Sequence, residues 1–120
     1  MTNIEKAISF LKMAGTGDVR SAYEKYIHHD FIHHNQYFKG DRTSLMVAME
    51  DAHRASPNKF IEIKKTYEQG DTVITHSLVA KETQDISVVH IFRFASGMVV
   101  ELWDIAQTIN KNSPNEHGIF

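Results

Sequence analysis

The sequence has no cysteine, only two prolines, and a net charge of only −2 over 120 residues. Without cysteine, disulfides and thiolate chemistry are excluded, and a reducing cytoplasm is the compartment that suits the chain. The near balance of 13 basic and 15 acidic residues, with no stripe of Lys or Arg, argues against a nucleic-acid partner. No apolar run is long enough to span a membrane, and the first residues lack the pattern of a secretory signal.

Hydrophobic residues make up 42% of the chain, which is enough for a core of ordinary size. A length of 120 residues, without an internal repeat or a linker, predicts one domain over residues 1–120. Within it we expect helices over residues 3–56, a sheet over residues 59–106 and a C-terminal tail over residues 107–120.

Three segments of the first half have apolar residues spaced three or four apart, the period of an amphipathic helix. Thr2 and Glu5 form a capping box before the first segment, and Gly15 is expected to end it. Asp18 and Asp41 are expected to cap the second and third helices. The apolar faces are Ile4, Ala7, Ile8 and Leu11, then Val19, Ala22, Tyr23 and Tyr26, then Leu45, Ala48, Met49 and Ala52.

Four segments of the second half are rich in Val, Ile and Thr and are separated by short turn sequences, which predicts hairpin-linked strands. The strands are expected at residues 60–68, 72–81, 86–94 and 98–106. Three helices before such a meander predict an α+β fold, with the helices packed on one face of an antiparallel sheet. The segment from His28 to Gly40 is expected to be a connector.

Three of the predicted strands each place one titratable residue in an apolar row: His76, His90 and Asp104. If these rows form the concave face under the helices, the three side chains line one pocket. A carboxylate at the end of an apolar row is costly to bury, so Asp104 is a candidate acid or base. The alternative is that both histidines are satisfied core residues and that Asp104 is a hydrogen-bonded structural carboxylate.

The connector holds four histidines within residues 28–34. Clustered imidazoles raise the hypothesis of a metal site, but their spacing matches no established metal motif, so we expect none. Solvent-facing histidines, or a pair at the mouth of a pocket, are the alternatives. His53 and His117 are expected to be exposed.

The strand faces turned away from the helices also appear apolar by alternation. A patch of that size is too large for a monomer, so the pattern predicts a homodimer through the outer sheet face. Trp103 is a suitable anchor there, because aromatic residues are enriched in subunit contacts. The residues expected on this face are Val73, Val79, Val89, Ile91, Val99, Trp103 and Ile105.

Four motifs together resemble one protein family. They are Ile-His-His-Asn-Gln at 32–36, Val-Val-His-Ile-Phe-Arg at 88–93, Gly-Met-Val-Val-Glu-Leu-Trp-Asp at 97–104 and Asn-Glu-His-Gly-Ile-Phe at 115–120. The pattern resembles SnoaL-like proteins of the nuclear-transport-factor-2-like, or ketosteroid-isomerase-like, superfamily. This resemblance implies a cone of three helices against a strongly curved sheet, as in cystatin-like folds, usually dimeric through the sheet.

The founding members of that family are polyketide cyclases that close a ring by aldol condensation without a metal or an organic cofactor. The resemblance places Asp104 on their acid–base aspartate, Asn35 on a pocket asparagine and His76 on a strand histidine. Two positions depart from the pattern. Leu102 stands where the family commonly has histidine, and His90 stands where it commonly has aspartate.

The leading hypothesis is therefore a small cofactor-independent lyase or isomerase acting on an apolar or aromatic carbonyl compound. Asp104 would remove a proton alpha to the carbonyl, assisted by His90 and His76. A non-catalytic binding module of the same fold is the alternative, and a dimeric scaffold is a third hypothesis. The expected substrate-binding residues are His34, Asn35, Leu102, Phe92 and Tyr23.

Overall fold

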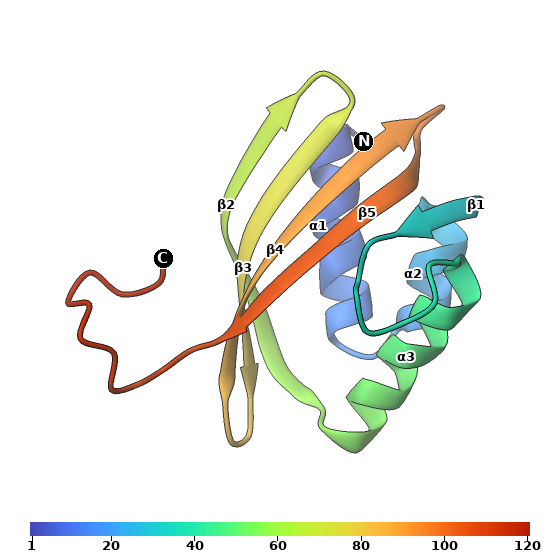
Figure 1. Cartoon of the computed structure of the whole chain (residues 1–120). Coiled ribbons are helices and arrows are strands. Elements are labelled where there is room, and N and C mark those ends of the chain that lie inside the picture. The colour runs from blue at the N-terminus through green and yellow to red at the C-terminus, as the bar shows by residue number, and fades with distance from the viewer.

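The computed structural model describes residues 1–120. Figure 1 shows three helices on one side of a curved, five-stranded sheet, with the C-terminal tail leaving at the end of the last strand. The helices are α1 (Asn3–Gly15), α2 (Val19–Tyr26) and α3 (Arg42–Ala55). The strands are β1 (Ile27–His33), β2 (Asn58–Gln69), β3 (Thr72–Lys81), β4 (Asp85–Ala95) and β5 (Met98–Thr108).

The caps that bound the helices agree largely with the sequence. The capping box is present, because Thr2 Oγ1 accepts from the Glu5 amide at 3.1 Å and Glu5 Oε1 accepts from the Thr2 amide at 3.0 Å. Asp41 Oδ2 likewise accepts from the Ser44 amide at 3.0 Å, whereas Asp18 makes no side-chain cap. None of the three helices is long and apolar enough to cross a membrane.

The backbone of Asp18 takes part in the turn that ends α1. Gly17, rather than Gly15, adopts a positive φ of 102°, and its amide donates to Ala14 O at 3.2 Å. The amide of Asp18 donates to Met13 O at 3.0 Å. These two bonds form a Schellman motif, so the backbone of Asp18 closes α1 at the point where α2 begins.

The strand order is β1-β5-β4-β3-β2, and the four strands expected from the sequence are antiparallel neighbours. The fifth strand, β1, lies in the segment expected to be a connector, and it runs parallel to β5. That expectation is wrong for Ile27–His33, and the sheet is mixed. The strand gave no alternating signal because it is irregular: Ile27 pairs with Val99, but Ile32 already pairs with Glu101.

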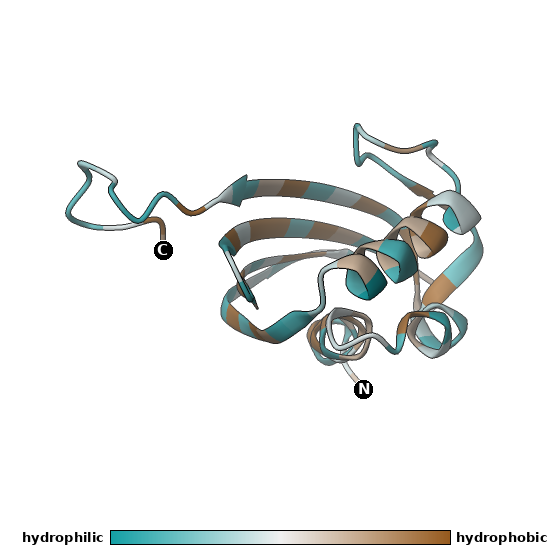
Figure 2. Ribbon diagram, turned by 90° about the horizontal axis from the view of Figure 1, so that it is seen from below, coloured by the Kyte–Doolittle hydropathy of each residue, from teal (hydrophilic) through white to brown (hydrophobic).

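The core lies between the helices and the concave face of the sheet, as Figure 2 shows from below. Phe10 of α1 is at its centre and is only 1% exposed. Its ring packs edge-on against Tyr23 of α2, with centroids 5.5 Å apart, and against Phe92 of β4, at 6.1 Å. These aromatic contacts connect two helices to the sheet.

The strand β3 turns the opposite face to the helices from the one expected. Val73, Thr75 and Ser77 are fully buried, so His76 lies on the outer face. Because β3 has apolar residues in both phases, alternation alone does not select its inner face. Pairing with β4 selects it, since Thr75 lies opposite His90.

The expected composition of the outer sheet face is corrected in the same way. Val73 and Val79 lie inside with the buried phase of β3. Val99 also lies inside, because the pairing shifts between Arg93 and Phe94 and the extra residue reverses the alternation of β5. The outer face carries Ile74, Leu78, Val89, Ile91, Trp103 and Ile105.

One of the two edges of the sheet is β2, which is irregular at two places. Its register shifts between Asn58 and Phe60, and again between Ile63 and Lys65. Two lysines, Lys64 and Lys65, lie at the second irregularity. The tail beyond β5 returns to this side of the sheet, where the Phe120 ring lies 4.7 Å from the ring of His76.

Candidate active site

A cavity of about 220 Å³ lies between α1, α3 and the concave face of the sheet. Nine of its fifteen lining residues are hydrophobic. Polar side chains gather at its two ends, with Asp104 and His90 from the central strands at one end. The polar lining residues are His53, Asn58, Lys81, His90 and Asp104.

Asp104 is held in place by a side chain from the loop after β1. Asn35 Nδ2 donates to Asp104 Oδ2 at 3.0 Å. The amide of Asn35 is fixed in turn, because its Oδ1 accepts from the Tyr37 amide at 3.0 Å and its backbone amide donates to His33 Nδ1 at 3.1 Å. Asn35 therefore orients one oxygen of Asp104, and the other oxygen faces His90.

His90 lies directly across from Asp104 on the neighbouring strand. Its Nε2 is 3.7 Å from Asp104 Oδ1, which is too far for a direct hydrogen bond. Burial lowers the pKa of His90 below its ordinary value, and the carboxylate of Asp104 opposes that shift without cancelling it. The His90 Nδ1 atom is buried without a hydrogen-bond partner. The pair is thus a carboxylate beside a neutral imidazole, and each has free capacity for a ligand.

The burial of His90 predicts a pH-dependent stability. Below about pH 6.5, the ordinary pKa of histidine, the unfolded chain binds a proton that the folded His90 excludes. The free energy of unfolding therefore decreases as the pH is lowered through this range. Urea unfolding from pH 7.5 to 5.5 measures this slope. His90→Gln is expected to flatten it, while the exposed His117→Gln control leaves it unchanged. Equal slopes in all three proteins would contradict a neutral His90.

Three of the predicted substrate-binding residues lie behind the site in the core. Tyr23, Phe92 and Leu102 are at most 2% exposed, and none lines the cavity. Burial raises the pKa of the Tyr23 hydroxyl well above its ordinary value, the Arg42 guanidinium opposes this, and the Asp104 carboxylate adds to it. These three side chains support the polar pair without facing a ligand.

Two other predicted site residues lie on the opposite side of the sheet. His76 Nε2 is 2.8 Å from Ser87 Oγ on the outer face, so the expected convergence of His76 with His90 and Asp104 is wrong. His34 Nε2 is 2.7 Å from Glu101 Oε2, and its ring stacks on Trp103 at 4.7 Å. His34, which was expected among the substrate-binding residues, does not line the cavity, because its side chain lies on the outer face with Glu101 and Trp103.

One cavity residue, His53 of α3, was expected to be exposed. It is half-buried and lines the cavity, and its Nδ1 atom is buried without a partner. The sequence does contain the signal, because His53 follows Met49 by four residues and so continues the apolar face of α3. Asn58 and Lys81 were also not predicted as site residues. Each lies at the end of a strand, where the alternation of polar and apolar residues does not define which face a side chain is on.

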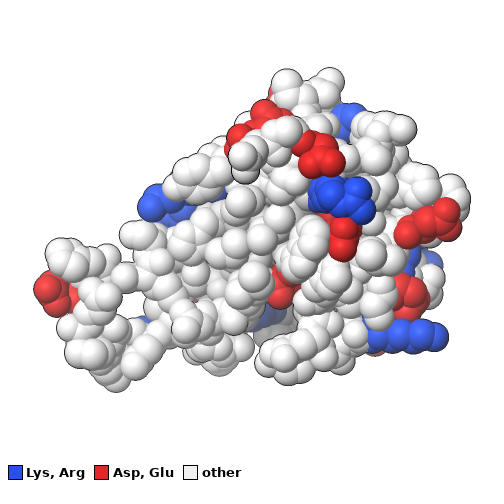
Figure 3. Space-filling view, turned by 45° about the horizontal axis from the view of Figure 1, so that its top comes forward, with Lys and Arg blue, Asp and Glu red and all other residues white.

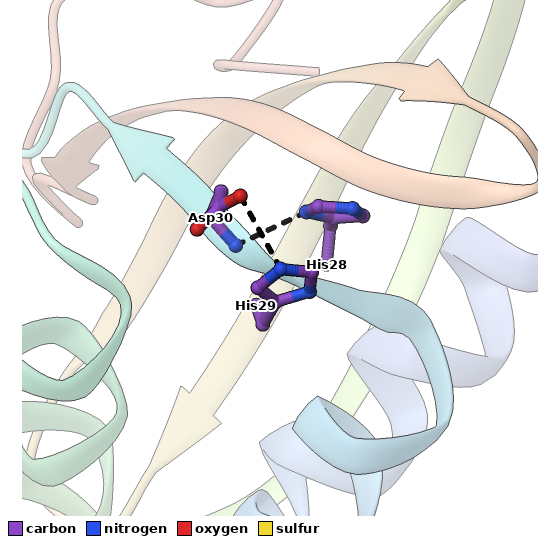
Figure 4. A group of neighbouring side chains, drawn as sticks. All are labelled: His28, His29 and Asp30. Carbon is purple, nitrogen blue, oxygen red and sulfur yellow. Dashed lines mark hydrogen bonds and ion pairs between the residues drawn. The ribbon is translucent and has the colours of Figure 1, made fainter.

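The histidines of β1 form a separate group at the edge of the sheet. Figure 4 shows His28, His29 and Asp30 together, and their candidate ligand atoms lie within 4.8 Å of one another. His28 Nδ1 accepts from the Asp30 amide at 3.0 Å, and His29 Nε2 lies 3.3 Å from Asp30 Oδ2. The irregular pairing of β1 brings these neighbours to one side. They do not line the cavity, so the candidate site is built without them.

Comparison with solved structures agrees with this architecture. An NTF2-like protein of unknown function from Burkholderia xenovorans superposes with a TM-score of 0.73 at 18% identity, covering 92% of this chain and 86% of the other. IdmH, a putative polyketide cyclase from Streptomyces antibioticus, gives 0.72 at 15% identity, covering 88% and 93%. A cystatin-fold protein from Novosphingobium aromaticivorans gives 0.72 at 19% identity, covering 88% and 98%.

These similarities establish the fold. No family model and no curated protein matches the sequence. The chain has the NTF2-like, cystatin-like α+β fold, which confirms the fold that the sequence resemblance implies. At such low identity the function has to be argued from the site itself.

Proposed function

We propose that this protein is a small, cofactor-independent acid–base enzyme of the cytoplasm that acts on a carbonyl compound. The observation that supports the proposal best is the pairing of Asp104 with Asn35 at the polar end of an apolar cavity. A carboxylate with one oxygen fixed and the other free is suited to accept a proton. The apolar cavity provides the environment in which such a carboxylate can act as a base on a C–H bond of the ligand.

The proposed chemistry begins with a ligand whose carbonyl lies beside His90. Asp104 Oδ1 takes a proton from the carbon alpha to the carbonyl, and the C–H electron pair moves into an enolate. The N–H of the neutral His90 donates to the enolate oxygen and so stabilises the charge that develops there. Return of the proton from Asp104 to another carbon completes an isomerisation. In an aldol-type cyclisation the enolate carbon instead attacks a second carbonyl, and Asp104 returns its proton to the alkoxide that forms there.

Deuterium exchange from solvent tests this function without knowledge of the natural substrate. The wild-type protein is incubated in D₂O with simple β-keto esters and cyclic enones, and incorporation alpha to the carbonyl is followed by NMR. We expect exchange faster than buffer for those compounds that fit the cavity. No exchange above buffer for any member that demonstrably binds would contradict the acid–base proposal.

A non-catalytic binding module of the same fold is the second candidate. It is favoured by Leu102, which stands at a position where the resembled family commonly has a histidine, and by the gap of 3.7 Å between His90 and Asp104. A binding module would hold the same carbonyl compounds with no exchange. Ligand titration and exchange on one set of compounds therefore separate the two functions.

We also propose that two copies associate through the outer sheet face. Apolar side chains occupy this face, and Ile105 alone is 58% exposed. Figure 3 shows a broad area without charged side chains over the sheet. Burial of this area against a second copy would remove apolar surface from water on both sides.

The variant Ile105→Lys tests this association. A lysine on the contact face would have to be desolvated, so we expect the dimer to weaken by about tenfold or more. Light scattering across a micromolar dilution series measures the effect. Ser21→Lys, which adds the same side chain to the exposed side of α2, serves as the control. A wild-type monomer throughout the series would contradict the dimer.

A further inference from the structure

The second polar end of the cavity lies where four elements meet. It is formed by the last turns of α1 and α3, the first residue of β2 and the last residue of β3, all at the lower end of the molecule in Figure 1. His53, Asn58 and Lys81 line the cavity there. The acid–base function described above uses none of them.

Lys81 is a partly buried cation without an anionic partner. Its Nζ donates to Ser56 O at 2.6 Å, and no carboxylate lies within ion-pair distance of it. Burial lowers the pKa of Lys81. A cation placed in this way gains more from a bound anion than a fully solvated lysine would, because less water competes for the charge.

The neighbours of Lys81 also have unfilled hydrogen-bonding capacity. His53 Nδ1 and Asn58 Oδ1 are both buried without a partner. The amide of Asn58 is already oriented, because its Nδ2 donates to Gly15 O at 2.8 Å. Buried polar atoms normally have partners, so unpaired atoms around one opening point to contacts that a ligand completes.

The two polar ends are separated by an apolar stretch of cavity. Thr75 of β3 lies opposite His90, and Lys81 ends the same strand roughly 20 Å further along it, before curvature and the length of the lysine side chain shorten the gap. The cavity of about 220 Å³ is smaller than a typical drug-sized pocket. It therefore fits a small, narrow molecule with polar groups at opposite ends.

We infer that Lys81 and His53 bind the carboxylate of a small keto acid whose carbonyl group reaches Asp104. The inference rests on the proposed acid–base function and adds the class of substrate. Charge favours this orientation, because the anion lies at the cationic end and away from the Asp104 carboxylate. Asn58 Oδ1 adds an acceptor, which a donor group of the ligand can fill.

A purely structural role for Lys81 makes a different prediction. Its bond to Ser56 O also caps the C-terminus of α3, where a cation is favourable. Loss of such a cap changes stability but not the preference between ligands. The decisive readout is therefore the ratio of two affinities, which a general loss of stability leaves unchanged.

The experiment compares matched acids and esters. 4-Acetylbenzoate and 5-oxohexanoate are titrated against their methyl esters into ¹⁵N-labelled protein at pH 7.5, and amide shifts give each affinity. We expect the wild type to bind the acids at least about tenfold more tightly than the esters. Lys81→Met is expected to bring the ratio close to one, and Lys81→Arg to retain most of it. His53→Leu is expected to lower the ratio by a smaller factor.

Two controls make the outcomes distinct. Lys111→Met removes an exposed charge from the tail and should leave the ratio unchanged, and Asp104→Asn should abolish exchange while keeping the preference for acids. Equal affinities of acid and ester in the wild type, no binding of any acid at millimolar concentration, or an unchanged ratio in Lys81→Met overturns the inference. If the esters exchange but acids and esters bind equally well, the acid–base function is retained and the anion site is rejected. If the acids bind more tightly but nothing exchanges, the acid–base function is rejected and the anion site is retained.

Discussion

Asp104→Asn is expected to lower deuterium exchange into the carbonyl panel by a factor of about 10² to 10⁴, the usual contribution of a positioned general base. An amide has nearly the same shape as the carboxylate but cannot accept the alpha proton. The bond from Asn35 Nδ2 can persist, because the introduced side chain retains one oxygen acceptor. The geometry is thus kept while the chemistry is removed, and NMR of the recovered ketones measures the difference.

The matched control is Asp51→Asn, the same change at an exposed position of α3 that pairs only with Arg54. It should exchange at the wild-type rate. Circular dichroism and thermal melting of both variants show whether each remains folded. Exchange at the wild-type rate in a folded Asp104→Asn protein would mean that another residue is the base, which contradicts the proposed mechanism.

Phe10→Ala is expected to reduce the free energy of unfolding by about 3–5 kcal/mol, the range for truncating a buried aromatic side chain. The ring is 1% exposed and touches Tyr23 and Phe92 edge-on, so its loss leaves a cavity at the junction of α1, α2 and β4. Chemical denaturation with urea measures the change. A loss of this size is comparable to the whole stability of many small domains.

Phe38→Ala is the comparison for that prediction. Phe38 is 46% exposed in the loop before α3, so the same truncation there should cost well under 1 kcal/mol, as is usual for surface changes. If the two variants lost similar stability, the aromatic junction would not be the centre of the core.

The helices and four of the strands were predictable because each carries a regular pattern. Apolar residues at helical spacing identified α1, α2 and α3, and β-branched segments between turn residues identified β2 to β5. The strand β1 could not be found in this way. Its pairing with β5 skips several residues between Ile27 and Ile32, so polar and apolar side chains do not alternate along it.

The candidate site was predictable only in part, for a reason that lies in the strands. Asp104 and His90 were expected on one face, and direct cross-strand pairing brings them together. Asn35 was identified by resemblance, and its bond to Asp104 gives it a physical role. His76 failed because β3 is apolar in both phases, and His34 failed because adjacent residues of an extended chain point to opposite sides.

The irregular edge strand β2 bears on how the protein behaves when concentrated. A long, regular edge strand offers unpaired amides and carbonyls to any other edge, and chains then add edge to edge into fibrils. In β2 the two shifts of register break that row, and Lys64 and Lys65 place positive charges beside the second one. Continuous strand-to-strand growth along this edge is therefore disfavoured.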